Sequence, residues 1–301
     1  MRIAISFSKI NPSTTGAYYE KAFEEEGHDV AWFDPQEFDN LTGKEAYELY
    51  VVVDDGMEFY SGTQTRREFP DIHPLVYIAI DTHVDESWFE WRLRLARDRA
   101  DLIACAQKNG ASRMDVITGR AFWLPLGCDP ETHHVGAREK EYNVCFVGHF
   151  GPKPWHELRM NLVDTLMREE FDPWFVGSAY LKDATEVYAR SRVVLNASAD
   201  SDVNMRMFEA ACSGSAILTD YFGDNGLQEL FRPETIATYR TVEEAPEILR
   251  DLLANDDARV AQARAARTHV LENHTYRHRV RQLVIEASMR GLLSAKTPIE
   301  V

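Results

Sequence analysis

Apolar runs of strand length alternate with helix-length amphipathic stretches along the first half of the chain. Between the first two runs, Tyr18, Tyr19, Ala22 and Phe23 recur at the spacing of one helix face. The expected strands of this half are residues 2–7, 29–33, 49–53, 73–80, 101–106 and 121–124. Continuous apolar strands that alternate with helices are typical of a parallel sheet covered on both faces. The pattern therefore predicts an α/β domain.

The same alternation restarts after a polar stretch at residues 131–141. A segment with two prolines and a glycine, residues 125–130, precedes it, and the two segments together indicate a linker. Beyond it we expect strands at 142–147, 174–176, 193–196 and 216–219, and helices at 246–254, 258–271 and 276–293. We therefore expect two domains, residues 1–135 and 136–275, and a C-terminal helical segment, residues 276–301. Ligands of parallel sheets bind beyond the carboxyl ends of the strands, so the turns after the strands matter most.

Composition narrows the classes of function. With 33 Lys and Arg against 49 Asp and Glu, the net charge is −16, which disfavours binding along duplex nucleic acid or an anionic membrane. A hydrophobic fraction of 45% is ordinary for a folded protein. The four cysteines show no C-x-x-C spacing and are expected to be buried free thiols. Since no leader or membrane-spanning run is evident either, we expect a cytoplasmic protein.

Several well-known catalytic motifs are missing from the sequence. It contains no G-x-G-x-x-G, G-x-x-x-x-G-K-[ST], H-E-x-x-H or G-x-S-x-G, so dehydrogenase, P-loop, zinc-hydrolase and serine-hydrolase functions lack support. We expect no metal site and no prosthetic group. Asp200 and Asp202 flank Ser201 after a strand, and they could hold Mg²⁺ or Mn²⁺ or instead cap the following helix.

Two loops of the second half could bind a phosphorylated ligand. Gly148, His149 and Lys153 follow a strand, and Arg159 lies on the next expected helix. Glycine permits a close approach of the backbone, and the cations would neutralise phosphate; an ordinary turn with surface cations is the alternative. The second loop leads into a helix.

On that helix, Arg206 and Glu209 are three residues apart and share one face. The carboxylate could accept two ribose hydroxyls while the arginine pairs with phosphate. An intrahelical ion pair between the two side chains is the alternative.

The turns of the first half carry acids and a histidine. Asp81 and His83 follow a central strand and could act as a base or orient a hydroxyl. Asp54, Asp55 and Glu58 follow another strand. Solvated turn acids are the alternative for both groups.

The segments NMRMFEAACSGSAILTDY (from Asn204) and HTYRHRV (from His274), with the weaker FVGHFG and LPLGCDP, resemble the CgeB-like glycosyltransferases. This resemblance implies a GT-B fold. That fold has two Rossmann-like domains whose parallel sheets face a central cleft, and a C-terminal helix that crosses back to the first domain. It also implies an acceptor site in the first domain and a nucleotide-sugar site in the second.

The resemblance assigns roles to individual residues. Glu209 matches the acid that binds the donor ribose, and Asn204 and Arg206 precede it. The phosphate-side loop matches Gly148–Lys153 and Arg159, and we add Ser178 at the next strand end. Lys153, Arg159 and Arg206 would neutralise the leaving diphosphate. Asp81 or His83 would activate the acceptor hydroxyl.

The expected reaction is metal-independent transfer of a sugar, with retention, from a nucleotide-diphosphate sugar (a UDP-sugar is favoured) to a hydroxyl of a glycan, protein or small molecule. One departure stands out: the family's first Glu of an E-x7-E pair is Ser201 here. This serine favours an inactive nucleotide-sugar binding module as an alternative. An epimerase of the same fold and a glycosyltransferase that modifies DNA bases are further alternatives.

Overall fold

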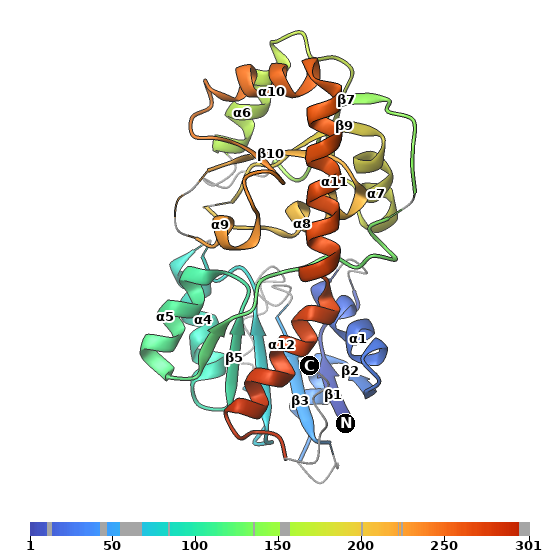
Figure 1. Cartoon of the computed structure of the whole chain (residues 1–301). Helices are drawn as coiled ribbons and strands as arrows, with labels where there is room; N and C mark the ends of the chain where they lie inside the picture. The colour runs from blue at the N-terminus through green and yellow to red at the C-terminus, as the bar shows by residue number, and fades with distance from the viewer. Residues whose placement is uncertain are drawn as a thin grey trace. The chain divides into compact units, whose positions relative to one another are not determined.

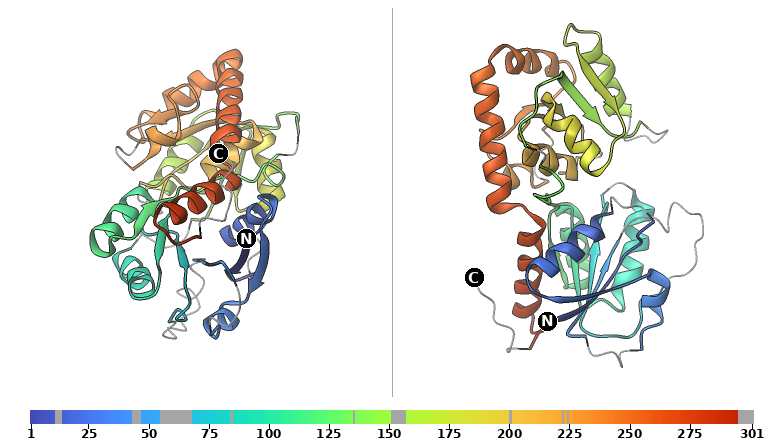
Figure 2. Two further views of the ribbon diagram at one scale, coloured as in Figure 1. Left: turned by 60° about the horizontal axis from the view of Figure 1, so that its bottom comes forward. Right: turned by 90° about the vertical axis from the view of Figure 1, so that its right-hand side faces the viewer.

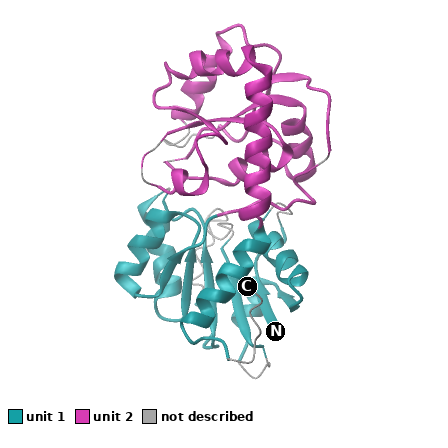
Figure 3. Ribbon diagram, in the orientation of Figure 1, with its two compact units in different colours: residues 1–125, 276–301 teal, residues 126–275 magenta. Residues whose placement is uncertain are grey.

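The computed structural model of the chain describes residues 1–10, 14–42, 47–54, 68–83, 85–134, 136–150, 157–199, 201–221, 223 and 225–294. The chain divides into two compact units (Figure 3). Unit 1 comprises Met1–Pro125 and Tyr276–Val301, and unit 2 comprises Leu126–Thr275. Each unit is an α/β structure built on one sheet (Figure 1).

Within the described part of unit 1, six strands form one sheet in which every pair is parallel. In sheet order they are β2 (Asp29–Phe33), β1 (Arg2–Ser6), β3 (Leu49–Val53), β4 (Leu75–Ala79), β5 (Leu102–Cys105) and β6 (Ala121–Trp123). The helices of this unit are α1 (Thr15–Glu25), α2 (Pro35–Asp39), α4 (Glu86–Arg97), α5 (Lys108–Thr118) and α12 (Tyr276–Met289).

Unit 2 holds a second parallel sheet, with five strands among its described residues. In sheet order they are β11 (Ala237–Tyr239), β10 (Ala216–Asp220), β9 (Ser191–Leu195), β7 (Tyr142–Val147) and β8 (Trp174–Gly177). The helices of this unit are α6 (Glu157–Met167), α7 (Leu181–Ala189), α8 (Met205–Ser213), α9 (Leu227–Leu230), α10 (Ala245–Ala254) and α11 (Asp256–Asn273).

The α/β fold class predicted from the apolar pattern is confirmed. Every expected strand is present and begins and ends within two residues of its expected position. The pattern missed α2, α5, α9 and β11. In α5 the reason is visible, because Val116 and Ile117 are exposed and obscure the helical periodicity.

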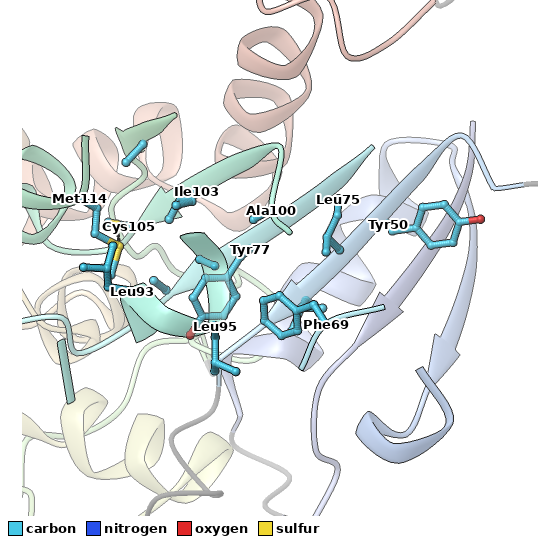
Figure 4. Close-up of a cluster of buried hydrophobic side chains, with 14 of the residues drawn as sticks. Tyr50, Phe69, Leu75, Tyr77, Leu93, Leu95, Ala100, Ile103, Cys105 and Met114 are labelled. Carbon is cyan, nitrogen blue, oxygen red and sulfur yellow. Dashed lines mark hydrogen bonds between the residues drawn. The ribbon is translucent and has the colours of Figure 1, made fainter. Parts of the chain in front are cut away.

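The core of unit 1 lies between its sheet and the helices that cover it. Leu75 and Tyr77 of β4 are buried with Ile103 of β5 and with Leu93 and Leu95 of α4 (Figure 4). The C-terminal helix α12 packs against the N-terminal helix α1 within the same unit (Figure 2). This packing ties residues near the two ends of the chain into one sheet-and-helix unit.

Aromatic stacking and a shared carboxylate join α12 to α1. Tyr18 and Tyr276 stack with ring centroids 5.0 Å apart. Both Arg277 and Arg281 donate to Glu26, at 2.5 and 2.6 Å. The two arginines lower the pKa of Glu26, against a burial effect that would raise it.

All four cysteines are buried free thiols, as expected. Burial raises the pKa of Cys105 and of Cys145 to about 12, so both thiols stay protonated near neutral pH. None of the helices described is long and apolar enough to cross a membrane.

Candidate functional site

In unit 2 the carboxyl ends of β7 and β9 are neighbours at the point where the strand order reverses. The chain continues from β7 to β8 on one side, whereas β9, β10 and β11 follow on the other side. Ligands of open parallel sheets bind at such a point. Arg206 in the first turn of α8 reaches it: Nε donates to the carbonyl oxygen of Val147 and Nη1 to Oδ1 of Asn196, both at 2.7 Å. The guanidinium thus links the ends of the two strands.

Arg159, from α6, spans the same pair of strands. Its Nη1 donates to the carbonyl oxygen of His149 and its Nη2 to that of Ala197, both at 3.1 Å. Arg159 is only 7% exposed, and its Nε has no hydrogen-bond partner among the described residues. The ring of Phe146 is close to both guanidinium groups, with its centroid 5.6 Å from Cζ of Arg159 and 4.8 Å from Cζ of Arg206. Two cationic groups therefore share one aromatic ring.

Neither of these arginines is neutralised by direct contact with a carboxylate of the described residues. No carboxylate oxygen of a described residue lies within 4.0 Å of either guanidinium. Asp202 and Asp220 act from farther away, and Asp220 accepts hydrogen bonds from the amide and hydroxyl of Ser198. Burial lowers the pKa of Arg159 to about 10, and the positive charge of Arg206 contributes to the lowering. This strand edge suits an anionic ligand.

His149 and Ser178 lie side by side beyond the ends of β7 and β8. Oγ of Ser178 is 3.3 Å from Nδ1 of His149, and the hydroxyl of Tyr180 is 2.8 Å from its Nε2. All three side chains are exposed. The backbone of Gly148 donates to the carbonyl oxygen of Gly177 at 2.9 Å, which holds the two loops together.

Glu209 lies one turn after Arg206 on α8. Its Oε1 is 3.4 Å from Nε2 of His133, and its Oε2 accepts a hydrogen bond from the hydroxyl of Tyr188 at 3.4 Å. Burial raises the pKa of Glu209 to about 7, although Arg206 and the Tyr188 hydrogen bond both act to lower it. The alternative of an intrahelical ion pair is wrong, because no guanidinium nitrogen of Arg206 lies within 4.0 Å of a carboxylate oxygen of Glu209.

The remaining residues predicted for this site differ in how far they are described. Asn204 occupies the N-cap position of α8 without a side-chain cap, and its Oδ1 is buried without a partner among the described residues. Ser201 has a φ of 63°. Lys153 and Asp200 lie outside the described residues. Within the described ranges no group of three or more His, Cys, Asp or Glu side chains is arranged to hold a metal ion.

In unit 1, Asp81 and His83 lie in the turn after β4. Asp81 has a φ of 55°, and Thr82 between them donates from its amide and hydroxyl to Oε1 of Gln107, at 3.2 Å each. Asp54, which follows β3, is buried and accepts a hydrogen bond from Nε of the buried Arg92. The alternative of a solvated acid is therefore wrong for Asp54. Asp55 and Glu58 lie outside the described residues.

Comparison with known proteins identifies the family. The profile of a glycosyl transferase-like family matches residues 133–285, just over half of the chain and most of unit 2. The chain belongs to this glycosyl transferase-like family. It is accordingly a glycosyltransferase. No curated protein sequence matches the chain significantly.

Solved structures of glycosyltransferases share its fold. The structure of HepE from Anabaena in complex with UDP and glucose superposes with a TM-score of 0.64 at 14% identity, covering 96% of this chain and 100% of that one. Sucrose-phosphate synthase from Thermosynechococcus elongatus gives 0.66 at 13% identity, covering 96% and 98%. An α-glucosyltransferase in complex with UDP and DNA containing an HMU base gives 0.64 at 10% identity, covering 96% and 99%. The predicted GT-B fold class, with two parallel sheets, is thus confirmed.

Sequence reasoning missed four residues around the site of this glycosyltransferase: Phe146, Asn196, His133 and Tyr188. Asn196 had a usable signal, since it is a polar residue directly after an apolar strand. His133 had no such signal, because it lies in a polar stretch with the composition of a linker.

Proposed function

We propose that the glycosyltransferase takes its sugar from a UDP-sugar bound at the β7–β9 edge of unit 2. The observation that carries the proposal is the pair Arg159 and Arg206, a buried and a half-buried cation at the strand-order reversal with no carboxylate in contact among the described residues. A nucleoside diphosphate would supply the missing negative charge. The UDP in the HepE structure supports the choice of nucleotide.

In this proposal the diphosphate lies against the arginines and the amino end of α8. Unpaired amides at a helix N-terminus favour anions, and Arg206 lies in the first turn of that helix. As the bond between sugar and diphosphate breaks, negative charge grows on the leaving group, and fixed cations stabilise it. Lys153 is proposed as a third cation. Glu209, one turn further along, accepts the hydroxyls of the ribose.

We further propose that catalysis needs no divalent metal, because arginines already provide the positive charge for the leaving group. Retention of the anomeric configuration and membership of the CgeB-like branch are proposed from the sequence resemblance. Activation of the acceptor hydroxyl by Asp81 or His83 is also a proposal. Activity that is unchanged by EDTA would support metal independence, whereas loss of activity that Mn²⁺ restores would revive the Asp200–Asp202 site.

The acceptor is proposed to be a hydroxyl of a glycan, protein or small molecule. DNA is the second candidate, favoured by the DNA-bound α-glucosyltransferase of the same fold. A net charge of −16 weighs against DNA. Transfer of radiolabelled sugar to duplex DNA with hydroxymethylated bases would separate the two, and the anomeric configuration of any product is read by NMR.

The test of the donor proposal is calorimetric titration of UDP, GDP, dTDP, ADP and uridine into the wild-type protein and Arg206→Gln. We expect UDP to bind most tightly. Loss of the charged hydrogen bonds should weaken UDP binding about 10–100-fold, and uridine binding much less. Arg168→Gln, an exposed arginine after α6, is the matched control. Equal weakening of UDP and uridine would contradict a phosphate role for Arg206.

A further inference from the structure

The carboxylate of Glu209 is contacted on both oxygens by buried groups from two other segments. Tyr188, from α7, is 2% exposed and donates its hydroxyl to Oε2. His133, from the loop before β7, is 1% exposed and has its Nε2 3.4 Å from Oε1. Neither group belongs to the phosphate-side loop or to α8. The carboxylate is therefore confined between two neighbours rather than left to rotate on its helix.

Local hydrogen bonds determine which nitrogen of His133 carries its proton. The amide of Asp129 donates to Nδ1 of His133 at 3.0 Å, so Nδ1 is an acceptor and Nε2 holds the hydrogen in the neutral ring. That hydrogen is on the nitrogen nearest Glu209. The amide of His133 donates in turn to the carbonyl oxygen of Asp129 at 2.8 Å. The ring is thus fixed both in tautomer and in position.

The turn that carries His133 is itself anchored. The carboxylate of Asp129 accepts from the amide of Glu131 at 3.2 Å and from the hydroxyl of Thr132 at 2.6 Å. The carbonyl oxygen of Thr132 accepts from the hydroxyl of Thr185 on α7, at 3.2 Å. The segment expected to be a linker therefore packs against the helix that also carries Tyr188.

We propose that His133 and Tyr188 are positioning residues for ribose recognition, which orient the Glu209 carboxylate so that its remaining lone pairs accept the two ribose hydroxyls of the donor. This rests on the proposed function, in which Glu209 contacts the ribose. A carboxylate has about four acceptor sites, so one bond on each oxygen still leaves a place for each hydroxyl. Neither His133 nor Tyr188 contacts the nucleotide in this arrangement; both act through Glu209.

The test compares UDP with 2′,3′-dideoxyuridine diphosphate, which lacks only the two hydroxyls. Calorimetry gives the ratio of the two dissociation constants for each protein variant, and a change in that ratio reports coupling to the hydroxyls alone. For the wild type we expect UDP to bind about 10–100-fold more tightly than the dideoxy analogue, since a site built for a hydroxyl rejects a ligand without it. Glu209→Gln should bring the ratio close to one.

His133→Leu and Tyr188→Phe should each reduce the ratio about three- to tenfold, while affinity for the dideoxy analogue stays near the wild-type value. His133→Gln, which keeps an N–H donor near the position of Nε2, should recover part of the ratio. Matched controls are His134→Leu, the exposed neighbour, and Tyr142→Phe on β7; both should leave the ratio unchanged. Circular dichroism and the melting temperature establish that each variant is folded.

The outcomes separate the two proposals. A wild-type ratio near one, or one that Glu209→Gln leaves intact, would overturn the ribose role of Glu209 in the proposed function. A large wild-type ratio that Glu209→Gln abolishes, but that Tyr188→Phe and a folded His133→Leu leave intact, would overturn the positioning role alone. If His133→Leu does not fold, Tyr188→Phe tests the positioning role by itself. This substitution removes a single hydroxyl oxygen from a buried ring and leaves the ring in place.

Discussion

The two sheets each place buried arginine at the carboxyl ends of their strands, and they balance its charge in opposite ways. In unit 1, Arg92 is paired with Asp54, and both side chains are almost completely buried. In unit 2, Arg159 and Arg206 donate to carbonyl and amide oxygens and contact no carboxylate of the described residues. The ion pair in unit 1 has no net charge and needs no further partner. The two arginines of unit 2 have no carboxylate partner among the described residues and are suited to binding an anion. The contrast supports the proposal that unit 2 binds the diphosphate.

The pKa values of Arg92 and Arg159 show the same difference between the two units. Burial alone would lower the pKa of Arg92, but Asp54, with Tyr77 and Asp81 adding to its field, raises it. For Arg159, burial and the charge of Arg206 both lower the pKa. One guanidinium is stabilised in its charged form by the protein itself, and the other would be stabilised by its ligand.

The largest expected effect is the loss of stability when the unit 1 pair is broken. Arg92→Ala leaves the Asp54 carboxylate buried without its partner, and breaking a buried ion pair in this way costs about 3–5 kcal/mol of unfolding free energy. Urea denaturation followed by circular dichroism measures the loss. Arg94→Ala, an exposed position on the same helix, is the control and should cost less than about 0.5 kcal/mol.

Asp54→Leu combined with Arg92→Met should recover most of that stability, since no charge is then left buried without a partner. A loss below about 1 kcal/mol for Arg92→Ala would contradict the structural role given to the pair. Asp54 would then not satisfy the charge of Arg92, and Arg92 would be as open to an anion as Arg159 and Arg206.

The next effect is on the pH dependence of donor binding. With its pKa raised to about 7 by burial, Glu209 is mostly protonated at pH 6 and mostly ionised at pH 8. A carboxylate accepts two hydroxyls better than a carboxylic acid, which uses one oxygen as a donor. UDP affinity of the wild type should therefore rise as the pH increases through 7 and level off above it, by up to about tenfold per pH unit below the pKa.

The phosphates of UDP titrate in the same range, so the wild type must be compared with a variant on the same ligand. With Glu209→Gln, the phosphates still contribute to the pH dependence of UDP binding, whereas the carboxyl group no longer does. Calorimetric titrations at pH 6, 7 and 8 should give a difference between the two proteins that grows with pH. A constant difference would mean that Glu209 does not change its charge in the free protein within this interval.

Much of the fold could be predicted from the sequence because the relevant signal is local. Strands β3, β4 and β5 are continuous runs of apolar residues, and such runs indicate buried parallel strands without any knowledge of their neighbours. The loops at the strand ends follow from the same reasoning. The placement of Gly148 and Arg206 at a candidate site could therefore be predicted from the sequence.

What could not be predicted depends on contacts between residues far apart in the chain. Nothing near Asp54 indicates that a helix almost forty residues later supplies its counterion. His133 lies in a polar stretch, and Glu209, which it contacts, comes about half of unit 2 later in the sequence. Short-range periodicity also fails for β11, which has only three residues. These features arise from tertiary packing, which a local pattern does not encode.

The smallest expected effect tests how tightly Arg206 is held at the unit 2 edge. A Cβ atom on Gly148 would lie 2.7 Å from Nη2 of Arg206 and 3.0 Å from Cζ of Phe146. The guanidinium is fixed by its bonds to Val147 and Asn196, so Gly148→Ala must displace it. Because the arginine remains present and charged, we expect UDP affinity to fall only about three- to tenfold, with a stability loss of about 1 kcal/mol.

Gly177→Ala is the matched control, at the end of the neighbouring strand β8. Its added Cβ would meet Phe175 at 3.5 Å, an ordinary contact, and would meet no arginine within 4 Å. Both variants are compared by calorimetric titration of UDP and uridine and by thermal unfolding. If Gly148→Ala weakened UDP and uridine equally, or no more than Gly177→Ala, the position of the Arg206 guanidinium would not matter for phosphate. The positive edge of unit 2 would then act through its net charge alone, not through the placement of its arginines.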